Sequence, residues 1–109
     1  MRVIDPNAAV DAIIKMAPEY AKAKAERIYL DEFKKSKKAL LMQEDTSGPI
    51  SAQERDAYAH QEYIDLLNAL RTAVEREEEL RWKLIAAQAR VEVYRTMEAS
   101  ARMEMKSTQ

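Results

Sequence analysis

The feature of this 109-residue sequence that most constrains its fold is a long segment with a 3.5-residue repeat of apolar residues and neither glycine nor proline. The segment begins near Ser51 and continues to Lys106. At 1.5 Å per residue it would form a helix of roughly 84 Å. With Tyr63 as heptad position a, twelve of the fourteen a and d positions are apolar. These positions hold Ala59, Tyr63, Leu66, Leu70, Ala73, Glu77, Leu80, Leu84, Ala87, Val91, Tyr94, Glu98, Ala101 and Met105. Such a repeat is typical of a helix that packs against another helix in a coiled coil.

Two further helices are predicted before this segment. Asp5 is a suitable N-cap and Pro6 a suitable first helical residue, so a short helix should cover residues 5–17. Pro18 has no amide hydrogen to donate within a helix and disfavours helical geometry in the residue before it. We therefore expect a break or kink there, followed by a second helix over residues 18–44.

The connection to the long helix is predicted to be short. Residues 45–50 read Asp-Thr-Ser-Gly-Pro-Ile and form the expected loop. Ser51 and Glu54 have the spacing of a capping box, which would start a helix over residues 51–106. The chain, residues 1–109, is therefore predicted to be a single helical domain. Its expected fold is an all-α, elongated antiparallel helical hairpin, coiled-coil-like, with a short N-terminal helix.

The composition excludes several classes of function. Gly48 is the single glycine, so no glycine-rich phosphate loop can form, and a turn-rich β-fold is disfavoured. Cysteine is absent, which excludes disulfides, thiolate nucleophiles and zinc knuckles. His60 is the single histidine, and the nearby Glu62 does not share its helical face at i+3 or i+4 spacing, as a metal site on a helix would require. No nucleophile, base and orienting group occur together, so we expect a protein that is not an enzyme, with no metal, cofactor or small-molecule substrate.

The helix lengths indicate a partner chain. Folding at the predicted loop pairs residues whose numbers sum to about 95. In this arrangement Pro18 lies opposite Glu77, and Asp5 reaches only about Arg90. Residues 91–106 then have no partner within the chain, although they continue the apolar repeat. An unpartnered apolar stripe indicates that another chain covers it.

We therefore expect a homo-oligomer or a helical protein partner at this end of the long helix. The predicted interface comprises Leu84, Val91, Tyr94 and Ala101 as apolar contacts, with Arg81, Arg90 and Arg95 selecting the partner. Cations at heptad positions e and g disfavour the pairing of identical segments and fit an acidic helix of another protein better. A second apolar stripe should pack against the first helix or a second subunit; it comprises Trp82, Ile85, Ala86, Ala89 and Val93. Both an adaptor and a structural subunit of a larger particle fit this pattern.

The basic residues support a second hypothesis, the binding of single-stranded nucleic acid. One group of candidate contacts is clustered in the second predicted helix and comprises Lys34, Lys35, Lys37 and Lys38. A second group, Arg81, Trp82 and Lys83, places an indole between two cations. Bases stack on aromatic side chains while cations bind the phosphates in proteins that hold single strands without sequence preference. The simpler interpretation is that Trp82 joins the apolar stripe and that the charges solvate long helices.

One segment also resembles a known group of proteins. Residues 80–102 contain Arg-Trp-Lys, followed by Gln88, Arg90, Glu92 and Arg95 at RWK-x4-Q-x-R-x-E-x2-R spacing. This segment resembles small helical proteins of tailed phages and prophages, which are often encoded near recombination and single-strand-binding genes. The resemblance implies an accessory role in phage recombination or replication and a location in the host cytoplasm. A cytoplasmic location is also expected because the sequence has no cysteine, no signal peptide and no apolar run of membrane-spanning length.

Overall fold

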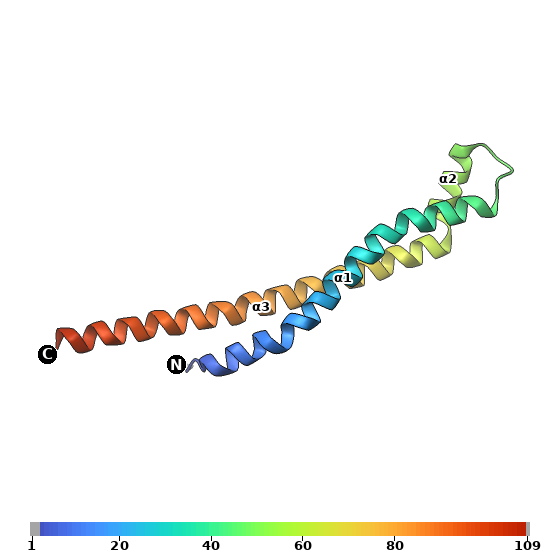
Figure 1. The fold of residues 1–109 in the computed structure, drawn as a ribbon. Helices are drawn as coiled ribbons and strands as arrows, with labels where there is room; N and C mark the ends of the chain where they lie inside the picture. Colours follow the sequence, from blue (N-terminus) through green and yellow to red (C-terminus); the bar gives the residue numbers. More distant parts are fainter. Residues whose placement is uncertain (1–2, 109) are drawn as a thin grey trace. The chain divides into compact units, whose positions relative to one another are not determined.

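The computed structural model describes residues 3–108, which form three α-helices and no strand (Figure 1). The helices are α1 (Pro6–Glu44), α2 (Ile50–Ala59) and α3 (Gln61–Ser107). They group into two compact units. The terminal unit comprises Met1–Tyr20 and Glu79–Gln109, and the loop unit comprises Ala21–Glu78. Each unit combines a stretch of α1 with a stretch of α3, so the predicted all-α helical hairpin is confirmed.

The start of α1 agrees with the sequence prediction. The Asp5 carboxylate accepts hydrogen bonds from the backbone amides of Asn7 at 3.0 Å and Ala8 at 3.3 Å. These are two of the amides that lack a partner in the first turn of a helix. Pro6 is the first residue of α1, where its missing amide hydrogen costs nothing.

The predicted boundary at Pro18 is absent, because α1 is continuous through this residue. The segments predicted as 5–17 and 18–44 therefore form one helix. Pro18 removes one hydrogen bond from the helix interior. However, buried and half-buried positions continue at helical spacing on both sides of it, from Met16 to Tyr20 and Ala23. A break at Pro18 would disturb this spacing, and helix formation is cooperative.

Both long helices bury residues at alternating steps of three and four. In α1 these residues are Ala9, Ile13, Met16, Tyr20, Ala23, Arg27, Leu30, Lys34, Lys37 and Leu41. In α3 they are Tyr63, Leu66, Leu70, Ala73, Glu77, Leu80, Leu84, Ala87, Val91 and Tyr94. The heptad repeat predicted for the long helix is thus confirmed between Tyr63 and Tyr94, and we call these α3 residues the inner stripe. Ala59, Glu98, Ala101 and Met105, which continue the repeat in the sequence, are exposed.

The prediction of a single helix over residues 51–106 is wrong, because the helix is interrupted at His60, between α2 and α3. Its backbone is extended, with φ −67° and ψ 138°. The His60 carbonyl accepts hydrogen bonds from the amides of Tyr63 and Ile64, and Nδ1 of its side chain accepts one from the Glu62 amide at 3.1 Å. His60 therefore caps the start of α3. The break allows Ala57 and Tyr63 to pack together against Leu41 in a small core.

The predicted capping box at the start of α2 is also absent. α2 begins at Ile50 with Pro49 as its N-cap and has no side-chain capping bond. The Gln53 side chain instead donates a hydrogen bond to the Gly48 carbonyl at 2.8 Å. The Glu54 carboxylate accepts one from Lys38 Nζ at 2.7 Å, so it is not available to the backbone. Glu54 thus holds α2 against α1.

In the structure, α2 and His60 lengthen the connection between α1 and α3. The residues of the two long helices that face each other therefore differ from the predicted pairs. Glu77 lies opposite Arg27, nine residues further along α1 than the predicted partner Pro18. Arg27 Nε and Nη2 donate to the two oxygens of Glu77 at 2.6 and 3.0 Å. The Glu77 side chain is 10% exposed and that of Arg27 31%. The polar interruption of the apolar repeat is therefore a partly buried, bidentate ion pair.

Candidate functional site

The C-terminal segment of α3, residues 95–107, is the most unusual surface of the terminal unit. Every residue from Arg95 to Thr108 is exposed, yet the helix continues to Ser107. Figure 1 shows α3 running past the N-terminus of α1, which accounts for this exposure. We call residues 95–107 the free segment. It is shorter than the predicted unpartnered stretch 91–106, because Val91 and Tyr94 are half-buried.

The apolar residues of the predicted interface divide into two groups. Leu84, Val91 and Tyr94 are half-buried members of the inner stripe, so they are largely used within the hairpin. Ala101 is exposed and belongs to the free segment. Leu84 and Val91 therefore have less surface to offer a partner than the sequence suggested, and their place in an interface stays a prediction. Within the terminal unit, half-buried residues of α3 extend to Tyr94, further than the sequence suggested.

The three predicted partner-selecting arginines lie on different parts of the terminal unit. The Arg81 guanidinium lies over the Trp82 ring, 4.8 Å from its centre. Arg90 is exposed and lines a small hollow of about 220 Å³ together with Ala8 of α1 and Asp5, which precedes this helix. Arg95 Nη1 donates to the Glu92 carboxylate at 3.1 Å, and both side chains are about 70% exposed. Arg90 and Arg95 therefore remain accessible to a partner.

A second stripe runs along α3 at heptad positions c and f, on the side away from the inner stripe. It comprises Trp82, Ala86, Ala89, Val93, Thr96, Ser100, Met103 and Ser107, and we call it the outer stripe. All eight residues are exposed, including Trp82 (58%), Val93 (49%) and Met103 (72%). The stripe predicted from Trp82 to Val93 is thus not covered by the first helix. The prediction from sequence did not extend this stripe to Ser107. The pattern is nevertheless visible in the sequence, where eight successive c and f positions carry no charged residue.

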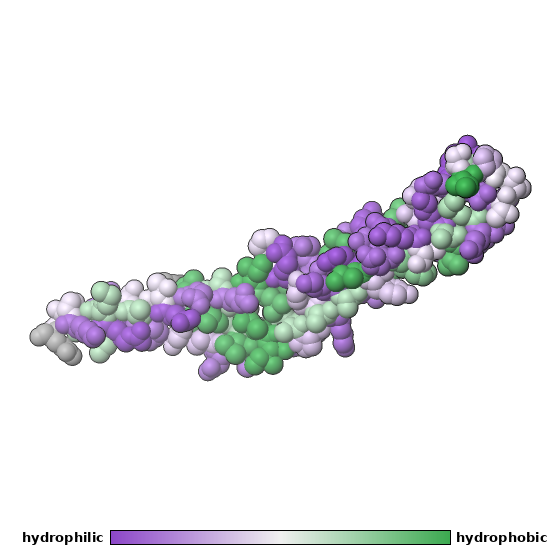
Figure 2. All heavy atoms as spheres, turned by 45° about the horizontal axis from the view of Figure 1, so that its top comes forward, coloured by the Kyte–Doolittle hydropathy of each residue, from purple (hydrophilic) through white to green (hydrophobic). Residues whose placement is uncertain are grey.

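Exposed apolar residues of α1 enlarge the uncovered surface of the terminal unit. Val10 is 43% and Ile14 66% exposed. Figure 2 shows hydrophobic residues gathered over the N-terminal part of α1 and the neighbouring part of α3. Apolar surface that lies together on a helical protein is typical of an interaction site.

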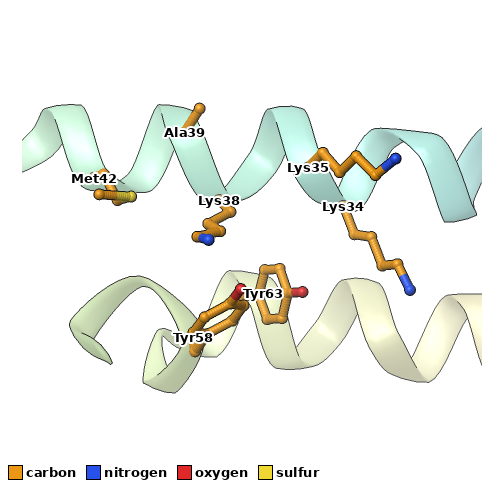
Figure 3. Close-up of a pocket in the computed structure, with 7 residues that line it drawn as sticks. All are labelled: Lys34, Lys35, Lys38, Ala39, Met42, Tyr58 and Tyr63. Carbon is orange, nitrogen blue, oxygen red and sulfur yellow. The ribbon is translucent and has the colours of Figure 1, made fainter. Parts of the chain in front are cut away.

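The loop unit contains a hollow of about 510 Å³ between α1 and the α2–α3 junction (Figure 3). It is lined by Lys34, Lys35, Lys38, Ala39, Met42, Tyr58 and Tyr63. Lys38 points toward Tyr58 in Figure 3, with its Nζ 4.7 Å from the ring centre. The rings of Tyr58 and Tyr63 pack edge to face with their centres 5.3 Å apart. The hydrogen bond from Lys38 to Glu54, followed by that to Tyr58, raises the pKa of Lys38 above its usual range.

The lysines proposed as nucleic-acid contacts all have acidic partners within the loop unit. Lys34 Nζ lies 3.0 Å from Asp31, and Lys35 Nζ lies 3.8 Å from Glu32. The hydrogen bond between Lys34 and Asp31 lowers the pKa of Asp31 and raises the pKa of Lys34. Lys37 Nζ lies 3.1 Å from Glu62, and Lys38 is paired with Glu54. The cluster therefore presents much less positive charge than its sequence suggests.

The other group of predicted nucleic-acid contacts belongs to the terminal unit. Trp82 is exposed, Arg81 lies over its ring, and Lys83 Nζ lies 3.1 Å from Glu79. The two groups thus occupy different units of the chain.

Neither a metal-binding cluster nor a membrane-spanning helix occurs among residues 3–108. No three histidine, aspartate or glutamate side chains of this part of the chain lie close enough together to hold a metal ion. None of the helices described has both the length and the apolar character needed to cross a membrane.

Comparisons with protein-family models, with curated proteins and with solved structures found no match to this chain. These comparisons add no support to the resemblance of residues 80–102 to phage proteins.

Proposed function

We propose that this chain is a non-enzymatic interaction protein that pairs the C-terminal part of α3 with a helix of another chain. The observation that carries this proposal is the fully exposed free segment. A short helix without packing is marginally stable in water, so a helix of this kind gains most from a partner. The free segment also presents Met97, Met103 and Met105, which are 46%, 72% and 64% exposed. Exposed methionines adapt to the shape of a partner and are common at interaction surfaces.

The exposure of the predicted contact residues supports a surface on the free segment. Leu84 and Val91 pack within the hairpin, whereas Ala101 and the three methionines are accessible. Arg90 and Arg95 border this surface and would select the partner by charge. Both an adaptor and a subunit of a larger particle would use the surface in this way. A phage origin and a cytoplasmic location stay part of this proposal.

A site-specific photo-crosslinking experiment tests the proposal. A photoreactive amino acid replaces Met103 in cells that naturally produce the chain. The matched control carries it at Glu75, an exposed residue at the same heptad position of α3. We expect a covalent product at position 103 and none at position 75. Absence of a product at position 103, with the protein folded and present, would overturn the proposal.

The second candidate function is accessory binding of single-stranded nucleic acid in phage recombination or replication. It is favoured by the 58% exposure of Trp82 between two cationic residues. The ion-paired state of the lysine cluster weighs against it. Trp82 fluorescence provides the test, because it is the single tryptophan of the chain. Quenching by a single-stranded oligonucleotide that is reversed by salt would support binding.

For this second function, Trp82→Ala should weaken oligonucleotide binding by about 1 to 3 kcal/mol, the range for one stacked base. Phe at this position keeps a stacking surface and serves as the control. Trp82 fluorescence that does not change when the oligonucleotide is added would contradict nucleic-acid binding at Trp82.

A further inference from the structure

We propose that the partner of the free segment is a second copy of this chain, paired antiparallel along the outer stripe over residues 89–107. The inference rests on the proposed function and names its partner. In this arrangement residue 98 of each copy lies at the two-fold axis. The two helices overlap over 19 residues, or about 28 Å. Each copy would contribute the same surface, as a symmetric dimer requires.

The outer stripe has the side chains of a helix–helix contact. Between residues 89 and 107 it contains Ala89, Val93, Thr96, Ser100, Met103 and Ser107, none of them charged. The outward positions of a hairpin helix are ordinarily polar and charged. Ala89, Ser100 and Ser107 are small and allow a second helix to approach closely. The outer stripe faces away from the inner stripe, so α1 of the terminal unit does not occupy it.

Two hydroxyl groups of this stripe already have partners within their own helix. Thr96 Oγ1 donates to the Glu92 carbonyl at 3.1 Å, and Ser107 Oγ donates to the Glu104 carbonyl at 2.8 Å. Burying a hydroxyl is costly mainly when it loses its hydrogen bond. Thr96 and Ser107 can therefore be covered by a second helix and keep these bonds.

The charges beside the stripe select the antiparallel orientation. One flank carries Arg90, Met97 and Glu104, so its charge changes from positive to negative along the helix. In an antiparallel pair each flank lies against the same flank of the other copy, in reverse order. Arg90 then lies beside Glu104 of the second copy, and Met97 lies beside Met97 of the second copy.

The other flank has the opposite polarity. It carries Glu92, Ala99 and Lys106, so Glu92 lies beside Lys106 of the second copy. The two-fold symmetry gives four interchain ion pairs and no facing pair of like charges. Glu92 would then exchange its present partner Arg95 for Lys106 of the second copy. The Glu92–Arg95 contact, at 3.1 Å, joins two mostly exposed side chains.

Other arrangements of two copies lack this complementarity. A parallel pair in register places Glu92 beside Met97 of the second copy and Ala99 beside Glu104, so it forms no ion pair. Pairing through the exposed end of the inner repeat would bring Arg95 beside Arg102 of the second copy. The outer stripe in antiparallel orientation is therefore the arrangement that the charges favour.

Charge reversal with mixing tests the proposal by sedimentation equilibrium over a range of concentrations. The wild-type chain should form a dimer. Arg90→Glu alone and Glu104→Arg alone should each self-associate roughly five- to thirty-fold more weakly, because two ion pairs become repulsive. An equimolar mixture of these two variants should regain wild-type association, since both pairs are restored between unlike chains. A mixture as weak as its components, or a wild-type chain that stays monomeric, overturns the proposal.

Single cysteines test the orientation, because the chain has none of its own. Ala99→Cys places thiols on the same flank close to the two-fold axis, so a short bifunctional thiol reagent should link the dimer efficiently. The proposed dimer uses Met97 and Met103 of the free segment and leaves the opposite side of α3, with Ala101, uncovered. Ala101→Cys is therefore the matched control and should link poorly. Preferential linkage at position 101 would overturn the proposed face.

The photo-crosslinking experiment at Met103 separates this inference from the proposed function. A product of twice the 12.5 kDa chain mass supports the dimer. A product of another mass, with no dimer in sedimentation, overturns the dimer and leaves the proposed function standing. No product and no dimer would overturn both.

Discussion

Replacement of Glu77 by alanine gives the sharpest test of how the hairpin is held together. Glu77 occupies position a of the inner stripe, where an apolar residue would ordinarily pack. It accepts hydrogen bonds from Arg27 Nε at 2.6 Å and Nη2 at 3.0 Å. Glu77→Ala removes both bonds and leaves the Arg27 guanidinium without this carboxylate in the seam of the loop unit.

The magnitude follows from the exposure of the two side chains. Breaking a fully buried ion pair costs about 3 to 5 kcal/mol. The Glu77 side chain is 10% exposed, but that of Arg27 is 31% exposed and can be partly rehydrated. We therefore expect Glu77→Ala to lower the free energy of unfolding by about 2 to 3 kcal/mol. For a chain of this length the Tm should fall by roughly 8 to 12 °C.

Circular dichroism at 222 nm during thermal and urea unfolding, at fixed protein concentration, measures this effect. The matched control is Glu79→Ala, which removes an ion pair with Lys83 whose side chains are 63% and 58% exposed. Its cost should stay below about 0.5 kcal/mol. Arg27→Leu combined with Glu77→Leu should return close to wild-type stability, because an apolar pair of this size replaces the ion pair. A Glu77→Ala variant as stable as the Glu79→Ala control would refute the reasoning.

Three further predictions concern the N-terminal half of α1 and the loop. Pro18→Ala should raise the free energy of unfolding by about 1 to 3 kcal/mol in urea unfolding, because α1 is continuous there and alanine restores a helical hydrogen bond; a destabilised variant would contradict this. Asp5→Ala should lower it by about 1 kcal/mol through loss of the N-cap, whereas Asp5→Asn should cost much less. Hydrogen bonds from the Ser47 hydroxyl and amide to the carboxylate lower the pKa of Asp45 below its ordinary value. The loop should therefore keep this stabilisation above about pH 4 and lose it as the pH falls through the folded-state pKa. Carboxyl NMR titration checks the pKa of Asp45, and a normal or raised value would contradict the prediction.

Much of the candidate surface could be inferred from sequence periodicity, but its boundaries could not. The sequence indicated an unpartnered end of the long helix, and the structure places that end after Tyr94. In the loop unit, Glu77 pairs with Arg27 and not with a residue near Pro18. Tyr20 and Arg27 lie seven residues apart and are both half-buried on α1, so the heptad repeat alone does not select one alignment.

The lysine cluster shows a second limit of sequence reasoning. Four cations within five residues predict a positively charged surface. Two of them, Lys37 and Lys38, are paired with Glu62 and Glu54 across the hairpin. These carboxylates are distant in sequence, so the neutralisation of the cluster depends on the fold.

The sequence by itself determined the helical class, the start of α1 at Pro6 after its cap Asp5, the buried repeat from Tyr63 to Tyr94 and the outer stripe from Trp82 to Val93. All of these depend on helical geometry and on contacts between residues a few positions apart. Only the tertiary structure decided the break at His60, the continuity of α1 through Pro18 and the pairing of Arg27 with Glu77. These features depend on which distant side chains pack together, and several alignments of two long helices would satisfy the same local pattern.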